Sequence, residues 1–263
     1  MKIILSRKGF DSLNGGCASP IMPDGTLLSL PIPSKDKLTY ADIAYQGLPY
    51  DQLLKQLNPQ KKYHNCHLDP DIYQGLRTTT IPPNWQPAFG QIGGPQGELQ
   101  NHDVGKDDLF LFFGWFRQVR RANDGSFGYA TNAPELHVIF GYLQVERVLT
   151  KPEEIASYNW HPHADSSRCN DKSNALYLAR KTLSFDKSKP GWGVLDFSEK
   201  RILTMQGCSK ATWREIPALM PENIVSKRKN NAKNQGIYYQ GIWQELILKE
   251  NSTSEQWANS VLL

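Results

Sequence analysis

The sequence predicts an α+β fold, in which a mixed or antiparallel β-sheet or barrel forms the core and short helices and long loops lie at its periphery. Apolar runs rich in β-branched and aromatic residues occur at residues 2–5, 108–116 and 136–145, and Gly, Asp and Ser clusters bound them, as is typical of strands. Helical periodicity is confined to short segments such as residues 51–57. Regions dense in Pro and Gly connect these elements, so long loops are predicted.

Length and composition indicate a globular protein. A chain of 263 residues with 39% hydrophobic and 21% charged residues can bury a substantial core, and disorder is not expected. No internal repeat or composition break divides the chain, so we predict a single domain over residues 1–263. The net charge of +4 permits a nucleic-acid partner without demanding one, and the basic run at residues 227–233 is better explained as a solvated loop.

The cysteine pattern and the hydropathy limit the cellular setting. Four cysteines lie far apart, with no spacing typical of a zinc ribbon or a disulfide framework. No apolar segment has the length of a signal peptide or the ~18 residues of a membrane helix. These features predict a cytoplasmic protein with reduced thiols and without a membrane partner.

The first element is expected to be a buried strand at residues 2–5, followed by a polar, Gly-rich turn. A Pro-Asp-Gly turn then leads to a second apolar strand at residues 27–30, so the stretch is predicted to be a hairpin, or a binding site built on one. A short helix is predicted at residues 51–57. Residues 77–105 are dense in Pro and Gly without a sustained period, which predicts a long surface loop.

The clearest secondary structure follows. The apolar runs at residues 108–116 and 136–145 are predicted to pair in the sheet or barrel. Lys151-Pro152 with two following acidic residues predicts a short helix. The remaining expected elements are strands at residues 175–179, 194–197, 201–205 and 243–248, and a terminal helix at about residues 254–262 with Ser252 or Ser254 as its N-cap.

Four stretches of the chain closely resemble the third type of nucleotide modification associated domain, a family found in phages and bacteria. They are residues 2–33, 66–72, 108–117 and 137–143, and the resemblance extends over essentially the whole chain. The family name reflects an inferred association with DNA base modification systems. The resemblance therefore implies a nucleotide or a nucleic acid as the partner.

The two aromatic strands are also similar to the central strand pair of PUA- and ASCH-type domains, small barrels that bind RNA or modified bases. This second resemblance would place a PUA-like barrel core around residues 106–150. An ordinary buried hairpin accounts for the same pattern equally well.

The polar turn after the first strand is the first candidate site. Arg7 and Lys8 beside flexible glycines can bind phosphate, because guanidinium and ammonium groups supply charge-assisted donors and Gly allows close backbone approach. Ser6 and Asp11 add polar groups at the C-terminal end of the strand, where α/β proteins commonly place sites. Surface charges on a hairpin are the alternative interpretation.

The second candidate is the group of His64, His67, Asp69 and Asp71. On an extended chain the two carboxylates would point to one side, which suits a hard cation, an acid/base pair or hydrogen bonds to a ligand. His67 with Asp69 could instead hold a proton. The alternative is that this segment caps a helix beginning near Ile72.

A third polar group comprises His161, His163, Asp165 and Asn174. The His-x-His spacing can bind zinc from a strand, but a complete site needs a further ligand from elsewhere. A surface turn stiffened by the intervening proline accounts for the group at least as well.

Gln244 and Glu245 resemble a late polar pair of the family, in an otherwise apolar strand. A buried carboxylate there needs a partner, for which Arg7 or Lys8 is the natural candidate. Trp115 is one of several aromatic residues on which a base could stack, although core burial accounts for most of them.

We interpret the chain as a protein of phage or bacterial DNA modification or defence systems that binds a nucleotide or a modified base; in the enzymatic version of this hypothesis it also acts on that ligand. The alternatives are a non-catalytic sensor or reader and a structural interaction protein. Nucleophile-elbow, zinc-peptidase and zinc-deaminase motifs are absent, and the sequence specifies neither a cofactor nor an oligomeric state.

The sharpest expectation is that Arg7 and Asp11 converge in space with Asp69 and Glu245. No residue is assigned as a metal ligand. The candidate catalytic residues are Asp11, Asp69, Asp71 and Glu245, and the candidate ligand-binding residues are Ser6, Arg7, Lys8, His67, Trp115, His161, Asn174 and Gln244.

Overall fold

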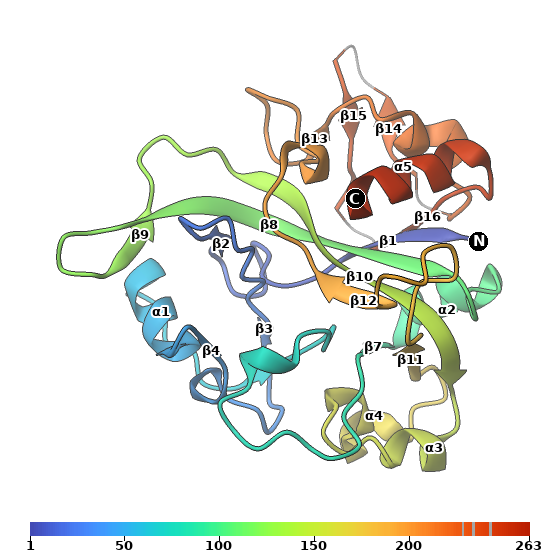
Figure 1. The fold of residues 1–263 in the computed structure, drawn as a ribbon, viewed down its shortest axis with the longest axis horizontal. Coiled ribbons are helices and arrows are strands. Elements are labelled where there is room, and N and C mark those ends of the chain that lie inside the picture. Colours follow the sequence, from blue (N-terminus) through green and yellow to red (C-terminus); the bar gives the residue numbers. More distant parts are fainter. Residues whose placement is uncertain (228, 233–234, 242–243) are drawn as a thin grey trace.

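A mixed β-sheet forms the centre of the molecule (Figure 1). The computed structural model describes residues 1–227, 229–232, 235–241 and 244–263. Within these residues the main sheet has nine strands. They are β1 (Ile3–Arg7), β2 (Ser19–Ile21), β7 (Ala88–Gln91), β8 (Leu109–Arg121), β9 (Phe127–Tyr129), β10 (Leu136–Leu149), β11 (Ala175–Ala179), β12 (Trp192–Val194) and β16 (Glu245–Ile247).

The central path of the sheet runs β16-β1-β8-β10-β11-β7, with β2 and β9 also paired to β8 and β12 paired to β10. The long strands β8 and β10 pair antiparallel, with Leu136 opposite Phe116 and Gln144 opposite Leu109. This confirms the predicted pairing. β1 lies parallel on β8 and antiparallel to β16, so the sheet is mixed.

The sheet is open over the described residues. β16 and β7 end the path and share no hydrogen-bonded ladder. The prediction of a mixed sheet with short helices and loops is therefore confirmed, and its barrel alternative is wrong. The strand pair that suggested a barrel is buried by layers on both faces, and closure is not needed to cover it.

Side chains alternate between these two layers because successive residues of a strand point to opposite faces. Ile3, Leu109 and Leu111 belong to a core shared with the C-terminal segment, whereas Ile4 and Phe110 belong to a core on the opposite face. The uninterrupted apolar runs at residues 3–5 of β1 and 109–113 of β8 are therefore typical of strands buried on both sides.

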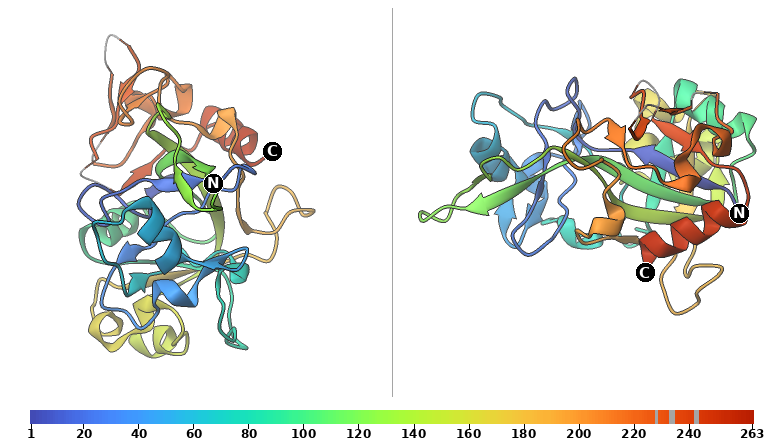
Figure 2. Two further views of the ribbon diagram at one scale, coloured as in Figure 1. Left: turned by 90° about the vertical axis from the view of Figure 1, so that its left-hand side faces the viewer. Right: turned by 90° about the horizontal axis from the view of Figure 1, so that it is seen from above.

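Short helices and small sheets cover both faces (Figures 1 and 2). In Figure 1, α5 and β13–β15 lie above the sheet, and α1, α3 and α4 lie below it. No helix in the described ranges is both long and apolar enough to cross a membrane. The remaining bounds are α1 (Tyr50–Leu57), α2 (Gly93–Asn101), α3 (Pro152–Ala156), α4 (Ser166–Cys169), α5 (Ser252–Leu262), β3 (Ile32–Pro33), β4 (Ala44–Tyr45), β5 (Leu48–Pro49), β6 (Cys66–His67), β13 (Thr212–Trp213), β14 (Asn231–Ala232) and β15 (Ile237–Tyr238).

The opening stretch is not a hairpin, so that prediction was wrong. β1 and β2 lie one after the other along β8, both parallel to it, with Arg7 opposite Phe113 and Ser19 opposite Phe116. Residues 27–30 form no strand. Turn signals are local, and they do not reveal that the partner strand lies much later in the sequence.

Residues 77–105 are not one long loop either. They contain β7 and α2, and Phe89 of β7 is fully buried. β7 pairs with β11, with Phe89 opposite Tyr177. Tertiary pairing therefore overrides the weak local preference of this segment.

Smaller corrections concern the C-terminal half. The strand expected at residues 194–197 is β12, which ends at Val194, and within residues 201–205 only Ile202 and Thr204 form isolated bridges. Asn251 caps α5, in place of Ser252 or Ser254, because its side chain accepts a hydrogen bond from the Ser254 backbone at 2.9 Å.

Some of the remaining predictions are confirmed, and others concern residues outside the described ranges. The helices at α1 and α3 and the strand β11 are confirmed. Trp243 of the predicted strand at 243–248, and Arg228 and Lys233 of the basic run, lie outside the described residues.

Candidate functional site

A buried polar cluster joins β1 to β16. The register places Ser6 opposite Glu245. Ser6 Oγ donates to Glu245 Oε1 at 3.1 Å, and Gln91 Nε2 donates to the same oxygen at 2.5 Å. Lys8 Nζ lies 3.7 Å from Glu245 Oε1 and 3.5 Å from Gln244 Oε1. Of the two expected partners of this carboxylate, Lys8 is therefore the one in contact.

Glu245 is fully surrounded by protein in this cluster, with its side chain 1% exposed. Burial raises the pKa of its carboxyl group, and Lys8, Ser6 and Gln91 oppose the rise. Its Oε2 atom is buried without a hydrogen-bond partner among the described residues. These contacts suit a role of Glu245 in fixing the position of Lys8. A catalytic role for Glu245 stays a prediction.

Two cavities share Arg7 and Asp11. The narrower one has a volume of about 60 Å³, and the wider one has a volume of about 210 Å³. The narrower cavity is also lined by Lys8, Gly9, Asn14, Ile32, Asp69 and Gln244. The wider cavity is also lined by Phe10, Ser12, Leu13, Trp115, His137, Lys210 and Gly241. Segments far apart in the sequence thus meet around the end of β1.

Asp11 orders the turn that presents Arg7. Its Oδ1 atom accepts hydrogen bonds from the backbone of Leu13 at 2.8 Å and of Asn14 at 2.6 Å. Its Oδ2 atom lies 3.6 Å from the Arg7 guanidinium. Gly9 between them has φ +78°, and a Cβ atom there would lie 2.7 Å from Ser29 Oγ, so the turn requires glycine.

Hydrogen-bond donors dominate the wider cavity. Trp213 Nε1 donates to His137 Nδ1 at 3.0 Å, which leaves the proton of a neutral His137 ring on Nε2. Burial first, and then the charges of Arg7 and Lys210, lower the pKa of His137 to about 3, so the ring is neutral near pH 7. Trp115 Nε1 is buried without a partner among the described residues. Lys210 Nζ lies 4.2 Å from the centroid of the Trp115 ring.

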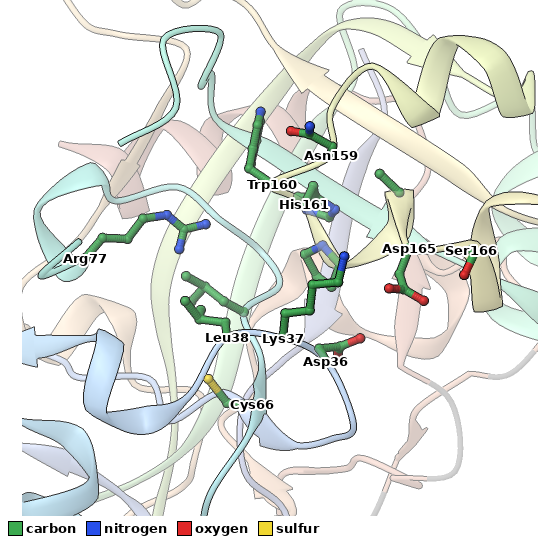
Figure 3. A pocket seen from close by; sticks show the side chains of 13 residues that line it. Asp36, Lys37, Leu38, Cys66, Arg77, Asn159, Trp160, His161, Asp165 and Ser166 are labelled. Atoms are coloured by element: carbon green, nitrogen blue, oxygen red, sulfur yellow. The ribbon is translucent and has the colours of Figure 1, made fainter. Parts of the chain in front are cut away.

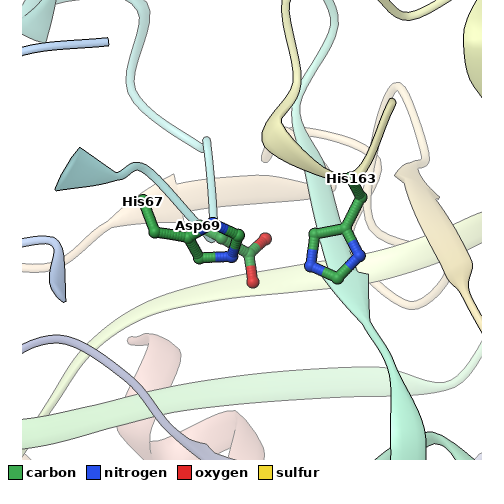
Figure 4. A group of neighbouring side chains, drawn as sticks. All are labelled: His67, Asp69 and His163. Atoms are coloured by element: carbon green, nitrogen blue, oxygen red, sulfur yellow. The ribbon is translucent and has the colours of Figure 1, made fainter. Parts of the chain in front are cut away.

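His67, Asp69 and His163 form a group next to the narrower cavity, with the Asp69 carboxylate turned toward the two rings (Figure 4). Each residue offers a ligand atom, and these atoms lie within 4.8 Å of one another. Asp69 Oδ1 accepts a hydrogen bond from the Gly90 backbone at 2.7 Å and lies 3.4 Å from His161 Nε2. Burial by itself would raise the pKa of Asp69, but the His161 ring and the charge of Lys8 hold it well below its usual range. The carboxylate is thus ionised near pH 7.

Outer contacts fix both rings of this group. His67 Nδ1 lies 2.7 Å from Asp36 Oδ2, and Arg168 pairs with the same carboxylate. His163 Nδ1 lies 2.6 Å from Asn174 Oδ1, while Asn174 Nδ2 donates to the His163 carbonyl at 2.9 Å. The second bond sets the orientation of the amide, so His163 Nδ1 must donate to its oxygen. Burial lowers the pKa of His163 to about 3, so its ring is neutral.

Asp71 lies apart from this group. Its carboxylate pairs with Arg77 and accepts a hydrogen bond from Trp85 Nε1 at 3.2 Å. Burial raises the pKa of this carboxyl group. The predicted helix at Ile72 is wrong, because only a 3₁₀ turn at Gln74–Leu76 follows. A catalytic role for Asp71 stays a prediction that these contacts do not favour.

The remaining polar candidates take local roles. Asp165 caps the short helix α4 by accepting a hydrogen bond from the Ser167 backbone at 3.0 Å. His64 is exposed, and its Nδ1 lies 2.7 Å from Asn65 Oδ1. Neither lies in the His67, Asp69 and His163 group.

Further cavities adjoin the histidines. One of about 200 Å³ is lined by Asp36, Arg77, Trp160 and His161, among others (Figure 3). Another, of about 310 Å³, is lined by aromatic residues and reaches Asp69. A cavity of about 740 Å³ elsewhere has Lys210 on its wall but no residue predicted for the site.

Sequence reasoning missed Asp36, Gln91, His137 and Lys210. Each stands alone in its segment, with no motif spacing that marks it. The exception is His137, which begins one of the stretches that carry the family resemblance. Residue type and family pattern could have found it, but neither points to its neighbours.

The fold and the site define an α+β protein with an open mixed sheet, whose first strand ends at a polar, cation-bearing cavity. The chain belongs to the nucleotide modification associated domain 3 family, whose model matches residues 2–256. Membership associates the chain with nucleotide modification systems. No curated protein and no solved structure matches it.

Proposed function

We propose that the protein binds a phosphate-bearing nucleotide, free or as a unit of a nucleic acid, at the two cavities that share Arg7. The observation that supports this proposal most strongly is the donor-rich wall of the wider cavity. Arg7 brings a guanidinium group and Lys210 an ammonium group that also pairs with Glu135 at 3.1 Å, and the lining residues His137 and Trp115 carry the neutral donors Nε2 and Nε1. Charge-assisted hydrogen bonds from such groups are the usual means of binding phosphate oxygens.

The described lining residues of the wider cavity carry two cations, Arg7 and Lys210, and one carboxylate, while Glu135, which pairs with Lys210 at 3.1 Å, lies outside this lining. Asp11 is the one acidic residue among those that line the wider cavity, and its carboxylate is already engaged by the turn and by Arg7. An incoming phosphate would therefore meet donors, with little repulsion from that carboxylate.

The cavity sizes suit one part of a nucleotide. The wider cavity, about 210 Å³, is smaller than the roughly 300–1,000 Å³ of typical small-molecule sites. It accommodates a phosphate with its sugar, or a single base. In the narrower cavity, Asp69 and Gln244 offer acceptors and an amide donor for the rest of the ligand. The ionised Asp69 is the carboxylate best placed to act as a base in an enzymatic version.

Thermal shift with matched ligand pairs tests this proposal, because a ligand that binds the native state raises its melting temperature. Nucleoside monophosphates are expected to raise the Tm, and the corresponding nucleosides much less. Arg7→Gln and Lys210→Gln should each abolish most of the phosphate-dependent shift. Lys106→Gln is the matched control, since Lys106 is exposed, pairs with Glu146 and lines neither cavity.

Equal stabilisation by nucleosides and nucleotides would contradict the phosphate site, as would unchanged shifts in both variants. Mass spectrometry of the recovered ligand separates an enzyme from a sensor. The enzymatic version is supported if the unaltered protein changes the ligand chemically and Asp69→Asn leaves the same ligand intact. A ligand that is always recovered intact supports the non-catalytic sensor.

A further inference from the structure

We propose that His67, Asp69 and His163 bind a divalent transition-metal ion of the zinc or iron(II) class. This site goes beyond nucleotide binding and does not depend on it. Two imidazoles and one carboxylate are ligands that suit such ions, whereas calcium and magnesium prefer sites built wholly from oxygen atoms. The three ligand atoms lie within 4.8 Å of one another (Figure 4), so small side-chain movements bring them to a common ion.

The hydrogen bonds of both rings suit ligation. Asp36 accepts from His67 Nδ1, and Asn174 accepts from His163 Nδ1. In its neutral form each ring therefore carries the proton on Nδ1 and offers a lone pair on Nε2. Among the described residues nothing hydrogen-bonds to Nε2 of either ring. Metal-binding histidines characteristically donate their other N–H to a carboxylate or an amide oxygen in this way.

The outer contacts form a continuous support. Arg168 pairs with Asp36, which holds His67. Asn174 bonds both the ring and the carbonyl of His163, so this residue is fixed at two points. A purely structural histidine needs one partner, whereas this arrangement restrains the direction in which each free nitrogen points.

Gly90 brings the carboxylate and one ring together. Its backbone N–H holds Asp69 Oδ1 at 2.7 Å, and a Cβ atom on this residue would lie 2.2 Å from the His163 ring. Only glycine lets the imidazole lie directly against the backbone that orients the carboxylate. The sequence thus favours a close approach of two ligands that come from different segments.

A set of three protein ligands leaves coordination positions open. Asp69 also lines the narrower cavity with Lys8 and Gln244, so an exogenous ligand can reach the ion from that side. His161 Nε2, which is buried without a hydrogen-bond partner in the described residues, lies 3.4 Å from Asp69 Oδ1. We assign His161 as a positioning residue for this carboxylate.

The direct test is metal binding by the full chain after removal of metals with a chelator and dialysis. Isothermal titration calorimetry with zinc chloride should show one high-affinity site. Addition of cobalt(II) should give visible d–d absorption that zinc abolishes. Absence of both signals in the folded protein would overturn the proposal.

Variants locate the ion. His67→Gln should weaken zinc binding by more than the ~10–100-fold that loss of an outer partner typically costs, and Asp36→Asn by about that range. His64→Gln, an exposed histidine close in sequence, and Cys208→Ser, a partly exposed thiol, should bind zinc as the unaltered chain does.

Circular dichroism checks that each variant folds. If His67→Gln does not fold, Asp36→Asn decides the question, because it keeps all three proposed ligands. Affinity in either folded variant equal to that of the unaltered chain would overturn the assignment, as would loss of binding in Cys208→Ser alone. Neither result bears on phosphate binding, which depends on Arg7 and Lys210, whereas Asp69 belongs to both proposals.

Discussion

Lys8 Nζ lies 3.7 Å from Glu245 Oε1, and the side chains are only 8% and 1% exposed, respectively. This ion pair links the residue that follows β1 to β16, near the opposite end of the chain. Such a pair is weak evidence for net stabilisation, because both charges lose their hydration on burial. The pair affects stability strongly when one partner is removed, because the other charge then stays buried without compensation.

We expect Lys8→Met to lower the free energy of unfolding by about 3–5 kcal/mol near neutral pH, because Glu245 then lacks its compensating charge. Adding Glu245→Gln should recover part of this loss. Urea unfolding of the two single variants and the double variant measures the coupling. The control is Lys55→Met, which removes an exposed pair with Asp51 and should change stability by only ~0.3–0.5 kcal/mol.

The pH dependence of the Lys8→Met variant has a definite sign. Burial already raises the pKa of Glu245, and loss of Lys8 raises it further. A carboxyl group whose pKa is raised on folding destabilises the protein as the pH rises through that value. The deficit of the variant should therefore be larger in alkaline than in mildly acidic buffer. A deficit independent of pH would contradict this account.

Replacement of Gly90 by alanine should damage the histidine group. The new Cβ atom would lie 2.2 Å from the His163 ring, so the ring or the strand must shift. Overpacking of this kind typically costs about 1–3 kcal/mol. Gly97→Ala is the matched control, because a Cβ atom there meets nothing within 4 Å and the residue lies inside α2. It should stabilise the protein by ~0.5–1 kcal/mol. Equal effects of the two substitutions would contradict the packing at Gly90.

His137 should make the protein less stable as the pH falls. Its pKa is lowered from 6.5 to about 3 in the folded state, mainly by burial, so between these values the unfolded chain binds the extra proton. The free energy of unfolding therefore decreases as the pH drops through this range. For one such group the loss between about pH 7 and about pH 5 is ~2 kcal/mol.

The measurement is denaturant unfolding of His137→Gln at both pH values. The variant cannot take up this proton, so its stability should change less between them, by ~2 kcal/mol. His102→Gln serves as control, because this partly exposed ring pairs with Glu98 at 3.4 Å. If both variants keep the full pH dependence of the unaltered chain, His137 is not the group responsible.

The cap of α5 gives a local prediction. Asn251→Ala should lower the free energy of unfolding by ~1 kcal/mol, because its side chain accepts a hydrogen bond from the Ser254 backbone. Ser252→Ala should have a much smaller effect, since Ser252 is the first helical residue and not the cap. Thermal or urea unfolding of the two variants distinguishes them. A larger loss of stability in Ser252→Ala than in Asn251→Ala would show that Ser252 is the cap.

The sequence by itself determined the elements whose local pattern is strong. These elements are β8, β10 and α1. Their apolar runs or helical periodicity indicate strand or helix without knowledge of the neighbouring elements. The same stretches carried the family resemblance, and the candidate turn at Arg7 was found from its residue types alone.

Only the tertiary structure decided the pairing of β1 and β7, and which of Arg7 and Lys8 contacts Glu245. β7 is a strand because β11 lies beside it, and β1 pairs with β8 although turn signals suggested a hairpin. Lys8 meets Glu245, and His163 meets Asp69, only because the sheet and its covering loops bring these segments together. Local sequence encodes backbone preference and burial, but the neighbours of a polar side chain depend on the register of distant strands.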